Sequence, residues 1–230
     1  MKQLSIILSL LLSYSLHGQI CNCPNSALSN EEMKPIKVFT FKHNKQIGVC
    51  GYHELKNKIT TYSEFVCYEC GEKKIIDMWD ATEDCRIEKK GDTLYIKQVY
   101  ELPIGRNFED VATPFHIYKL YYSHNKITEE CFYRKDIPLY TKKQIEEIIN
   151  RFYHLKKENS EVNLNEGYML FWAFVSGSKE AENCLKQMEK TYGPFDGAIE
   201  ELWNFIFYTY INYKSGSTSV KHIYFNEKYN

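Results

Sequence analysis

The chain has 230 residues, of which 43% are hydrophobic and 26% charged, as in an ordinary globular protein with a core of its own. Its 29 basic and 30 acidic residues leave a net charge of −1, which argues against nucleic acid or an anionic membrane as the dominant partner. Aromatic residues are frequent, with 19 tyrosines and 13 phenylalanines. We expect most of them in the core, although such residues also suit sugar-binding or peptide-binding surfaces.

Residues 1–18 have the pattern of a secretory signal peptide. Lys2 supplies a positive charge, Leu4–Leu12 is an apolar run too short to span a bilayer, and Gly18 is a small residue before the expected cleavage. No later segment resembles a transmembrane helix, so we expect a secreted or periplasmic protein. The alternative is a lipoprotein anchored through Cys21, although Ile20 is bulky where a lipidation signal has a small residue.

Residues 19–139 predict a region of antiparallel β-structure. Their short connections indicate a meandering sheet of about eight strands, arranged as a sandwich, an open barrel or a strongly curved sheet. The segment Leu102–Thr113 is a longer loop, either an ordered cover over one end of the sheet or a binding loop. The strands are expected at 36–42, 47–53, 64–69, 74–79, 85–89, 93–102, 115–122 and 127–133.

A symmetrical register about the turns brings apolar residues onto one face of this sheet. The turn Cys70–Lys73 places Cys67 opposite Ile76, and the charged loop His53–Ser63 places Cys50 opposite Cys67. Cys50 and Cys67 are therefore the candidates for a cross-strand disulfide. The whole face is expected to contain Phe39, Phe41, Cys50, Tyr52, Phe65, Cys67, Ile76 and Met78.

Residues 140–214 predict a four-helix region, which makes the chain an α+β protein. Thr141 and Gln144 have the spacing of a capping box at the start of the first helix. The second helix is expected at Tyr168–Val175, and the third from Ser178 as N-cap to Tyr192.

The fourth helix is expected at Gly197–Lys214, with Trp203 facing the second helix. Residues 215–230 begin with a Ser/Gly/Thr run typical of a flexible linker. The segment Val220–Phe225 that follows is expected to be either an edge strand of the sheet or a tail.

All eight cysteines follow the expected cleavage site, and an exported chain meets an oxidising environment. Disulfides are therefore favoured, and no cofactor or metal is expected. The alternative is a zinc site made of Cys21, Cys23, Cys67 and Cys70, although the C-x-C spacing does not match a usual zinc knuckle. The C-x-x-C motif falls on a strand end and a turn, which disfavours a thioredoxin-like redox site.

No catalytic signature is present in the sequence. Several acids follow Trp79, and Asp80 and Asp84 are the candidates for the carboxylate pair of a glycosidase. The competing interpretation of these acids is a solvated turn between two strands. We therefore expect a non-catalytic binding module of the cell envelope or the secreted fraction, with another protein or a carbohydrate as partner. The alternative is a hydrolase of an envelope or extracellular polymer with its site near Trp79–Asp84. A pocket that gathers acids and a histidine would favour the hydrolase, and a shallow aromatic surface would favour binding.

Overall fold

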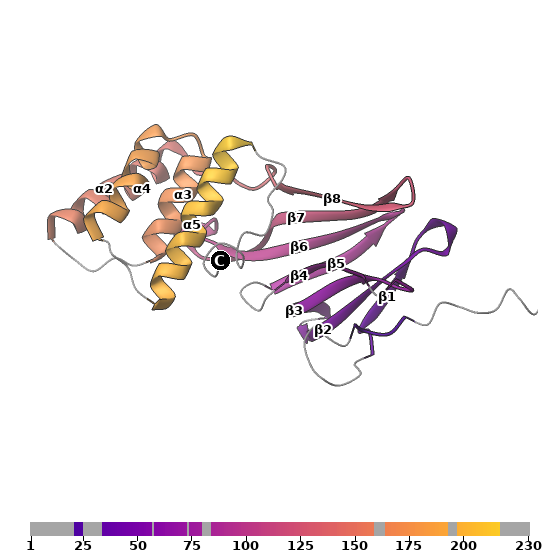
Figure 1. Ribbon diagram of the computed structural model, residues 1–230. Helices are drawn as coiled ribbons and strands as arrows, with labels where there is room; N and C mark the ends of the chain where they lie inside the picture. Colours follow the sequence, from indigo (N-terminus) through magenta and orange to yellow (C-terminus); the bar gives the residue numbers. More distant parts are fainter. Residues whose placement is uncertain are drawn as a thin grey trace, which may run out of the picture. The chain divides into compact units, whose positions relative to one another are not determined.

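The computed structural model confirms the α+β class. Eight strands precede four α-helices in the described part of the chain (Figure 1). None of the described helices is long and apolar enough to cross a membrane. The expected signal peptide and the segment Val220–Phe225 lie outside the described residues, which are 21–24, 34–56, 58–72, 74–79, 84–158, 164–192 and 197–216.

The strands form one antiparallel sheet in the order β1-β2-β3-β5-β6-β7-β8, and β4 pairs with β3 beside this path. Because β1 and β8 end the order of the described strands, the sheet is not closed. The strands are β1 (Lys37–Thr40), β2 (Gln46–Lys56), β3 (Ile59–Glu69), β4 (Lys74–Trp79), β5 (Asp84–Lys90), β6 (Thr93–Leu102), β7 (Val111–Ser123) and β8 (Lys126–Tyr133).

The expected register between β2 and β3 is wrong by one residue. Cys50 lies opposite Val66, and Cys67 lies opposite Val49. The hairpin is closed tightly by the pair Lys56–Ile59 instead of by a broad charged loop, and β2 shifts its register between Gly51 and His53. A bulge of this kind is not visible as a symmetrical pattern in the sequence.

A second shift, between Cys67 and Tyr68 of β3, changes the pairing with β4. It places Trp79 opposite Phe65, where Met78 was expected. The rings of Trp79 and Phe65 stack with centroids 4.9 Å apart, and Met78 is 45% exposed.

The expected apolar face is therefore correct in part. Tyr52 and Met78 are exposed and Ile76 is half-buried. The buried members are Phe39, Phe41, Cys50, Phe65 and Cys67.

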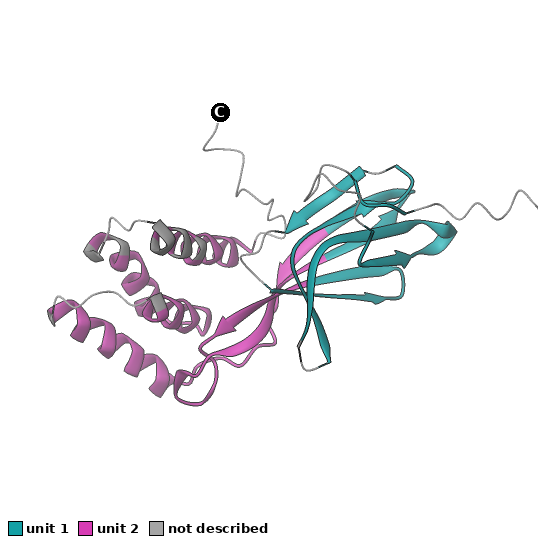
Figure 2. Cartoon of the chain, turned by 90° about the horizontal axis from the view of Figure 1, so that it is seen from below, with its two compact units in different colours: residues 1–96, 119–129 teal, residues 97–118, 130–230 magenta. Residues whose placement is uncertain are grey.

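The chain divides into two compact units (Figure 2). Unit 1 comprises residues 1–96 and 119–129, and unit 2 comprises residues 97–118 and 130–230. Unit 2 contains the four helices, which are α2 (Lys142–Glu158), α3 (Leu164–Val175), α4 (Lys179–Tyr192) and α5 (Gly197–Ser215).

Helix α3 is the central helix of unit 2 and contacts α2, α4 and α5. Its apolar sequence predicts this burial, and residues Met169–Ala173 are almost completely enclosed. Gly167 allows α5 to approach closely, since a Cβ there would lie 3.3 Å from the side chains of Trp203 and Ile206. Trp203 is 2% exposed, which confirms that it faces α3.

Two helix starts also confirm the sequence interpretation. The Gln144 amide N–H donates to the Thr141 hydroxyl at 3.3 Å, and the Thr141 amide N–H donates to the Gln144 side chain at 2.9 Å. This is the reciprocal geometry of a capping box. At the start of α4, the Ala181 amide N–H donates to the Ser178 hydroxyl at 3.1 Å.

Candidate functional site

Two disulfides of unit 1 attach the segment Cys21–Pro24 to the sheet. Cys21 bonds to Cys70 just beyond β3, and Cys23 bonds to Cys50 on β2, with Cα atoms 4.9 and 5.9 Å apart. The expected Cys50–Cys67 disulfide is therefore wrong, because in the observed register these two cysteines do not lie opposite each other. Cys50 is oxidised with a different partner, and Cys67 is a free thiol.

The same bonds exclude the zinc alternative in the oxidised chain, because three of its four sulfurs are consumed in disulfides. The described residues contain no cluster of three or more potential metal ligands. Cys67 is completely buried, and its burial raises the pKa of its thiol well above the ordinary value, with Asp77, Cys85 and Glu129 adding to the effect. A thiol in this environment is inert, which agrees with a structural role.

The region proposed for a hydrolase site is described only in part, because residues 80–83 lie outside the described residues. Trp79 is 2% exposed and stacked on Phe65, so it belongs to the core and offers no platform to a ligand. Asp84 is exposed at the first position of β5. Asp80 lies outside the described residues, so the expected carboxylate pair is not tested.

The loop Leu102–Thr113 is ordered and packs on the helical core of unit 2. The Tyr140 hydroxyl donates to the Pro103 carbonyl oxygen at 2.6 Å. The Phe108 ring lies edge-on to the Tyr140 ring, with centroids 5.4 Å apart. Tyr140 therefore anchors the loop, and burial raises the pKa of its hydroxyl far above the physiological range.

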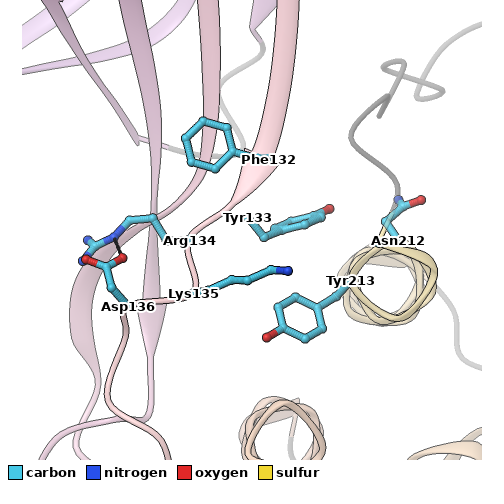
Figure 3. Close-up of a pocket in the computed structure, with 8 residues that line it drawn as sticks. Phe132, Tyr133, Arg134, Lys135, Asp136, Asn212 and Tyr213 are labelled. Atoms are coloured by element: carbon cyan, nitrogen blue, oxygen red, sulfur yellow. Dashed lines mark hydrogen bonds and ion pairs between the residues drawn. The ribbon is translucent and has the colours of Figure 1, made fainter.

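The candidate site is a cavity of about 430 Å³ in unit 2, between the end of β8 and the last turns of α5 (Figure 3). It opens at the surface, because Lys135, Asp136 and Gly216 are exposed. We call it the aromatic pocket, and its lining is Phe132, Tyr133, Arg134, Lys135, Asp136, Asn212, Tyr213 and Gly216.

Its aromatic wall continues directly into the core of unit 2. The ring centroids of Tyr133 and Tyr213 are 6.1 Å apart, and both rings contact Phe115, at 5.1 and 6.3 Å. Tyr213 also meets the rings of Phe171 and Phe174. Because these neighbours surround the two tyrosines, the wall is fixed in shape before any ligand arrives.

His116 supports the wall from behind. Its ring stacks on Tyr133, with centroids 4.6 Å apart and planes 18° apart. Its Nδ1 atom lies 2.9 Å from Oε1 of Gln98. His116 is buried and is not part of the pocket lining, so it positions Tyr133 and does not face a ligand.

The polar groups of the pocket come mainly from the extended segment after β8. Arg134 and Asp136 form a two-point ion pair, with N···O distances of 2.9 and 3.0 Å. Arg134 also donates to the carbonyl oxygen of Pro114 at 3.3 Å, which fixes the segment against β7. The Arg134 guanidinium lowers the pKa of the Asp136 carboxyl. These two charges therefore neutralise each other.

Lys135, between these two residues in the chain, keeps its positive charge available. It is exposed and forms no ion pair with any part of the chain that the structure describes. Its side chain points toward the space between the rings of Tyr133 and Tyr213 (Figure 3). On the helix side, Nδ2 of Asn212 is buried without a hydrogen-bond partner among the described residues.

The sequence did not reveal this site. Its residues lie in two segments far apart in the chain, and none of them belongs to a recognisable motif. The available signals were the aromatic end of β8 followed by Arg-Lys-Asp, and the surplus of aromatic residues on α5. Only packing of α5 beside β8 turns these signals into a cavity.

Comparisons with known protein families, curated proteins and solved structures find no match for this chain.

Proposed function

We propose that this chain is an exported binding module without catalytic activity, and that the aromatic pocket is its ligand site. The observation that carries the proposal is the composition of the pocket lining. Among the described residues of the lining, aromatic rings form the wall, and the ammonium group of Lys135 and the buried amide of Asn212 supply the polar contacts. Small-molecule sites commonly combine an apolar wall with a few placed polar groups in this way.

The titratable groups of the lining support binding over catalysis. General acid–base chemistry needs a group whose pKa lies near the working pH. In the pocket, Arg134 lowers the pKa of Asp136, and burial raises that of Tyr213. Both shifts move the group away from neutrality. Among the described residues of the lining, Asp136 is the one carboxylate, whereas hydrolysis of a glycosidic bond uses a pair.

The proposed location outside the cytoplasm rests on the two disulfides together with the amino-terminal sequence. Disulfides persist in oxidising compartments such as the periplasm or the extracellular space. The Sγ atom of Cys21 is bonded to Cys70, so it is not available for a lipid thioether. This favours the secreted or periplasmic form over the lipoprotein.

Retention of the protein on immobilised glycans and peptides would test the proposal. We expect wild type to bind a subset of the panel and Tyr213→Ala to lose that binding. Ile211→Ala is the matched control, because Ile211 lies on the same helix, is 50% exposed and does not line the pocket. Equal retention of wild type and Tyr213→Ala would contradict the assignment of the site.

A further inference from the structure

We infer that the ligand of the aromatic pocket is an acidic sugar, in which a carboxylate is attached to a pyranose ring. The inference rests on the proposed function and specifies the ligand class of the same site. Three features of the pocket support it, namely its net charge, its buried amide donor and its aromatic wall.

The charge of the pocket favours an anion. Arg134 and Asp136 satisfy each other, so the positive charge that remains among the described lining residues is that of Lys135. A carboxylate placed near its ammonium group would form a charge-assisted hydrogen bond. A cationic ligand would meet Lys135, and the described residues of the lining offer no free carboxylate to balance its charge.

Lys135 is not needed as a hydrogen-bond partner for the carbonyl groups at the end of helix α5. The last carbonyl groups of a helix carry partial negative charge and commonly attract a lysine. Here the Asn212 carbonyl accepts from the Ser215 hydroxyl at 3.0 Å, and the Tyr213 carbonyl accepts from the Gly216 amide N–H at 3.4 Å. These carbonyls already have partners within the chain, which leaves the ammonium group to a ligand.

The side-chain amide of Asn212 favours a ligand that carries a hydrogen-bond acceptor. A buried N–H without a partner costs free energy, and a ligand oxygen would remove that cost. Hydroxyl, ring and carboxylate oxygens of a sugar are acceptors of this kind. A purely hydrocarbon ligand would leave the amide unsatisfied.

The wall and the size of the pocket favour a sugar ring. Tyr133 and Tyr213 present aromatic surface on which the C–H face of a pyranose can pack, and their hydroxyls keep part of that surface polar. The volume of about 430 Å³ is near the lower end of the roughly 300–1,000 Å³ typical of small-molecule pockets. A short saccharide unit fits this volume better than a folded partner.

Titration calorimetry with two disaccharides of equal size tests the inference. Digalacturonate carries carboxylates, and galactobiose is its neutral counterpart. We expect wild type to bind digalacturonate roughly tenfold or more tightly than galactobiose, as a charge-assisted hydrogen bond predicts. We also expect the preference to shrink as salt is raised.

Two variants assign the preference to named atoms. Lys135→Glu reverses the charge at an exposed position and should abolish digalacturonate binding. Asn212→Asp keeps the shape of the side chain but replaces the donor with an acceptor, so it should weaken binding roughly tenfold or more. Ile211→Ala should bind like wild type, and thermal unfolding of each variant checks that the fold is retained.

The outcomes separate the ligand class from the broader proposal. Equal affinity for the two disaccharides, or an unchanged affinity in Lys135→Glu, would overturn the acidic-sugar inference and leave a sugar-binding pocket. Absence of binding to both disaccharides would also overturn it. The broader proposal would then fall only if no glycan or peptide of the immobilised panel is retained in a Tyr213-dependent manner.

Discussion

The ring of Tyr213, near the end of α5, lies 6.1 Å from the ring of Tyr133, at the end of β8. Both rings pack on Phe115 of β7, so the wall of the aromatic pocket is also part of the hydrophobic core of unit 2. A site built in this way is rigid, and binding to it does not require a loop to become ordered.

Trp203 is the residue of α5 whose loss should destabilise unit 2 most clearly. It is 2% exposed and packs where Gly167 of α3 leaves room, so Trp203→Ala should lower the free energy of unfolding by about 3–5 kcal/mol. Phe207→Ala should cost less, because Phe207 is only half-buried. Urea denaturation of the two variants tests this order. A larger loss in Phe207→Ala than in Trp203→Ala would reverse the assignment of the inner face of α5.

The cysteine pairing predicts a specific peptide map. Non-reducing digestion should release the linked pairs Cys21–Cys70 and Cys23–Cys50, and the thiol of Cys67 should react with an alkylating reagent only after unfolding. Cys23→Ala opens the second disulfide and should lower stability by about 3–4 kcal/mol. Recovery of a Cys50–Cys67 linked peptide would contradict the register of β2 and β3.

Gly48 should not tolerate a side chain. It lies opposite Tyr68 in the β2–β3 ladder, and a Cβ at this position would overlap the Tyr68 ring. Gly48→Ala should therefore cost about 1–3 kcal/mol through overpacking. Tyr68→Phe is the matched control, because it keeps the ring and removes only the hydroxyl, which lies 3.1 Å from the Cys21 sulfur. Chemical denaturation of both variants gives the comparison, and full stability of Gly48→Ala would show that the ring does not occupy this place.

Glu182 should make the stability of unit 2 dependent on acid pH. Its carboxylate accepts hydrogen bonds from Lys186, Lys214 and the Tyr210 hydroxyl, which lower its pKa from 4.5 to about 2. Because the folded pKa is depressed, the stabilisation is complete above about pH 4.5 and is lost as the pH falls toward 2.

The variant Glu182→Gln isolates this contribution. In urea titrations, the difference in unfolding free energy between wild type and Glu182→Gln should stay constant from neutral pH down to about pH 5 and narrow at lower pH. A difference that persists unchanged to pH 2.5 would mean that Glu182 acts through packing and not through its charge.

Much of the fold was predictable because its signals are local. The apolar alternation of the strands, the capping box at Thr141 and Gln144 and the N-cap at Ser178 depend on a few neighbouring residues each, and the structure confirms them. The register of β2 was not predictable in this way. The shift between Gly51 and His53 moves Cys50 one residue from its expected position opposite β3, and a symmetrical pairing about the turn does not predict this shift.

The disulfides and the pocket were missed for a related reason. Cys23 and Cys50 meet because Cys21–Pro24 lies against the sheet, and no spacing rule encodes that contact. The pocket is lined by residues from different parts of the chain, such as Lys135 after β8 and Asn212 on α5, and only the tertiary structure brings them together. The hydrolase hypothesis near Trp79–Asp84 stays untested, because Asp80 lies outside the described residues. The structure shows only that Trp79 itself is stacked on Phe65 inside the core.

The most direct test of the proposed binding function is a single incubation in which both the binding and the cleavage of a ligand are measured. Wild type and Tyr213→Ala are each mixed with acidic oligosaccharides, and the retained and the free sugars are identified by mass spectrometry. We predict that wild type retains oligosaccharide of unchanged mass and that Tyr213→Ala retains none. The appearance of shorter fragments, or equal retention by the two proteins, would contradict a non-catalytic binding module whose site is the aromatic pocket.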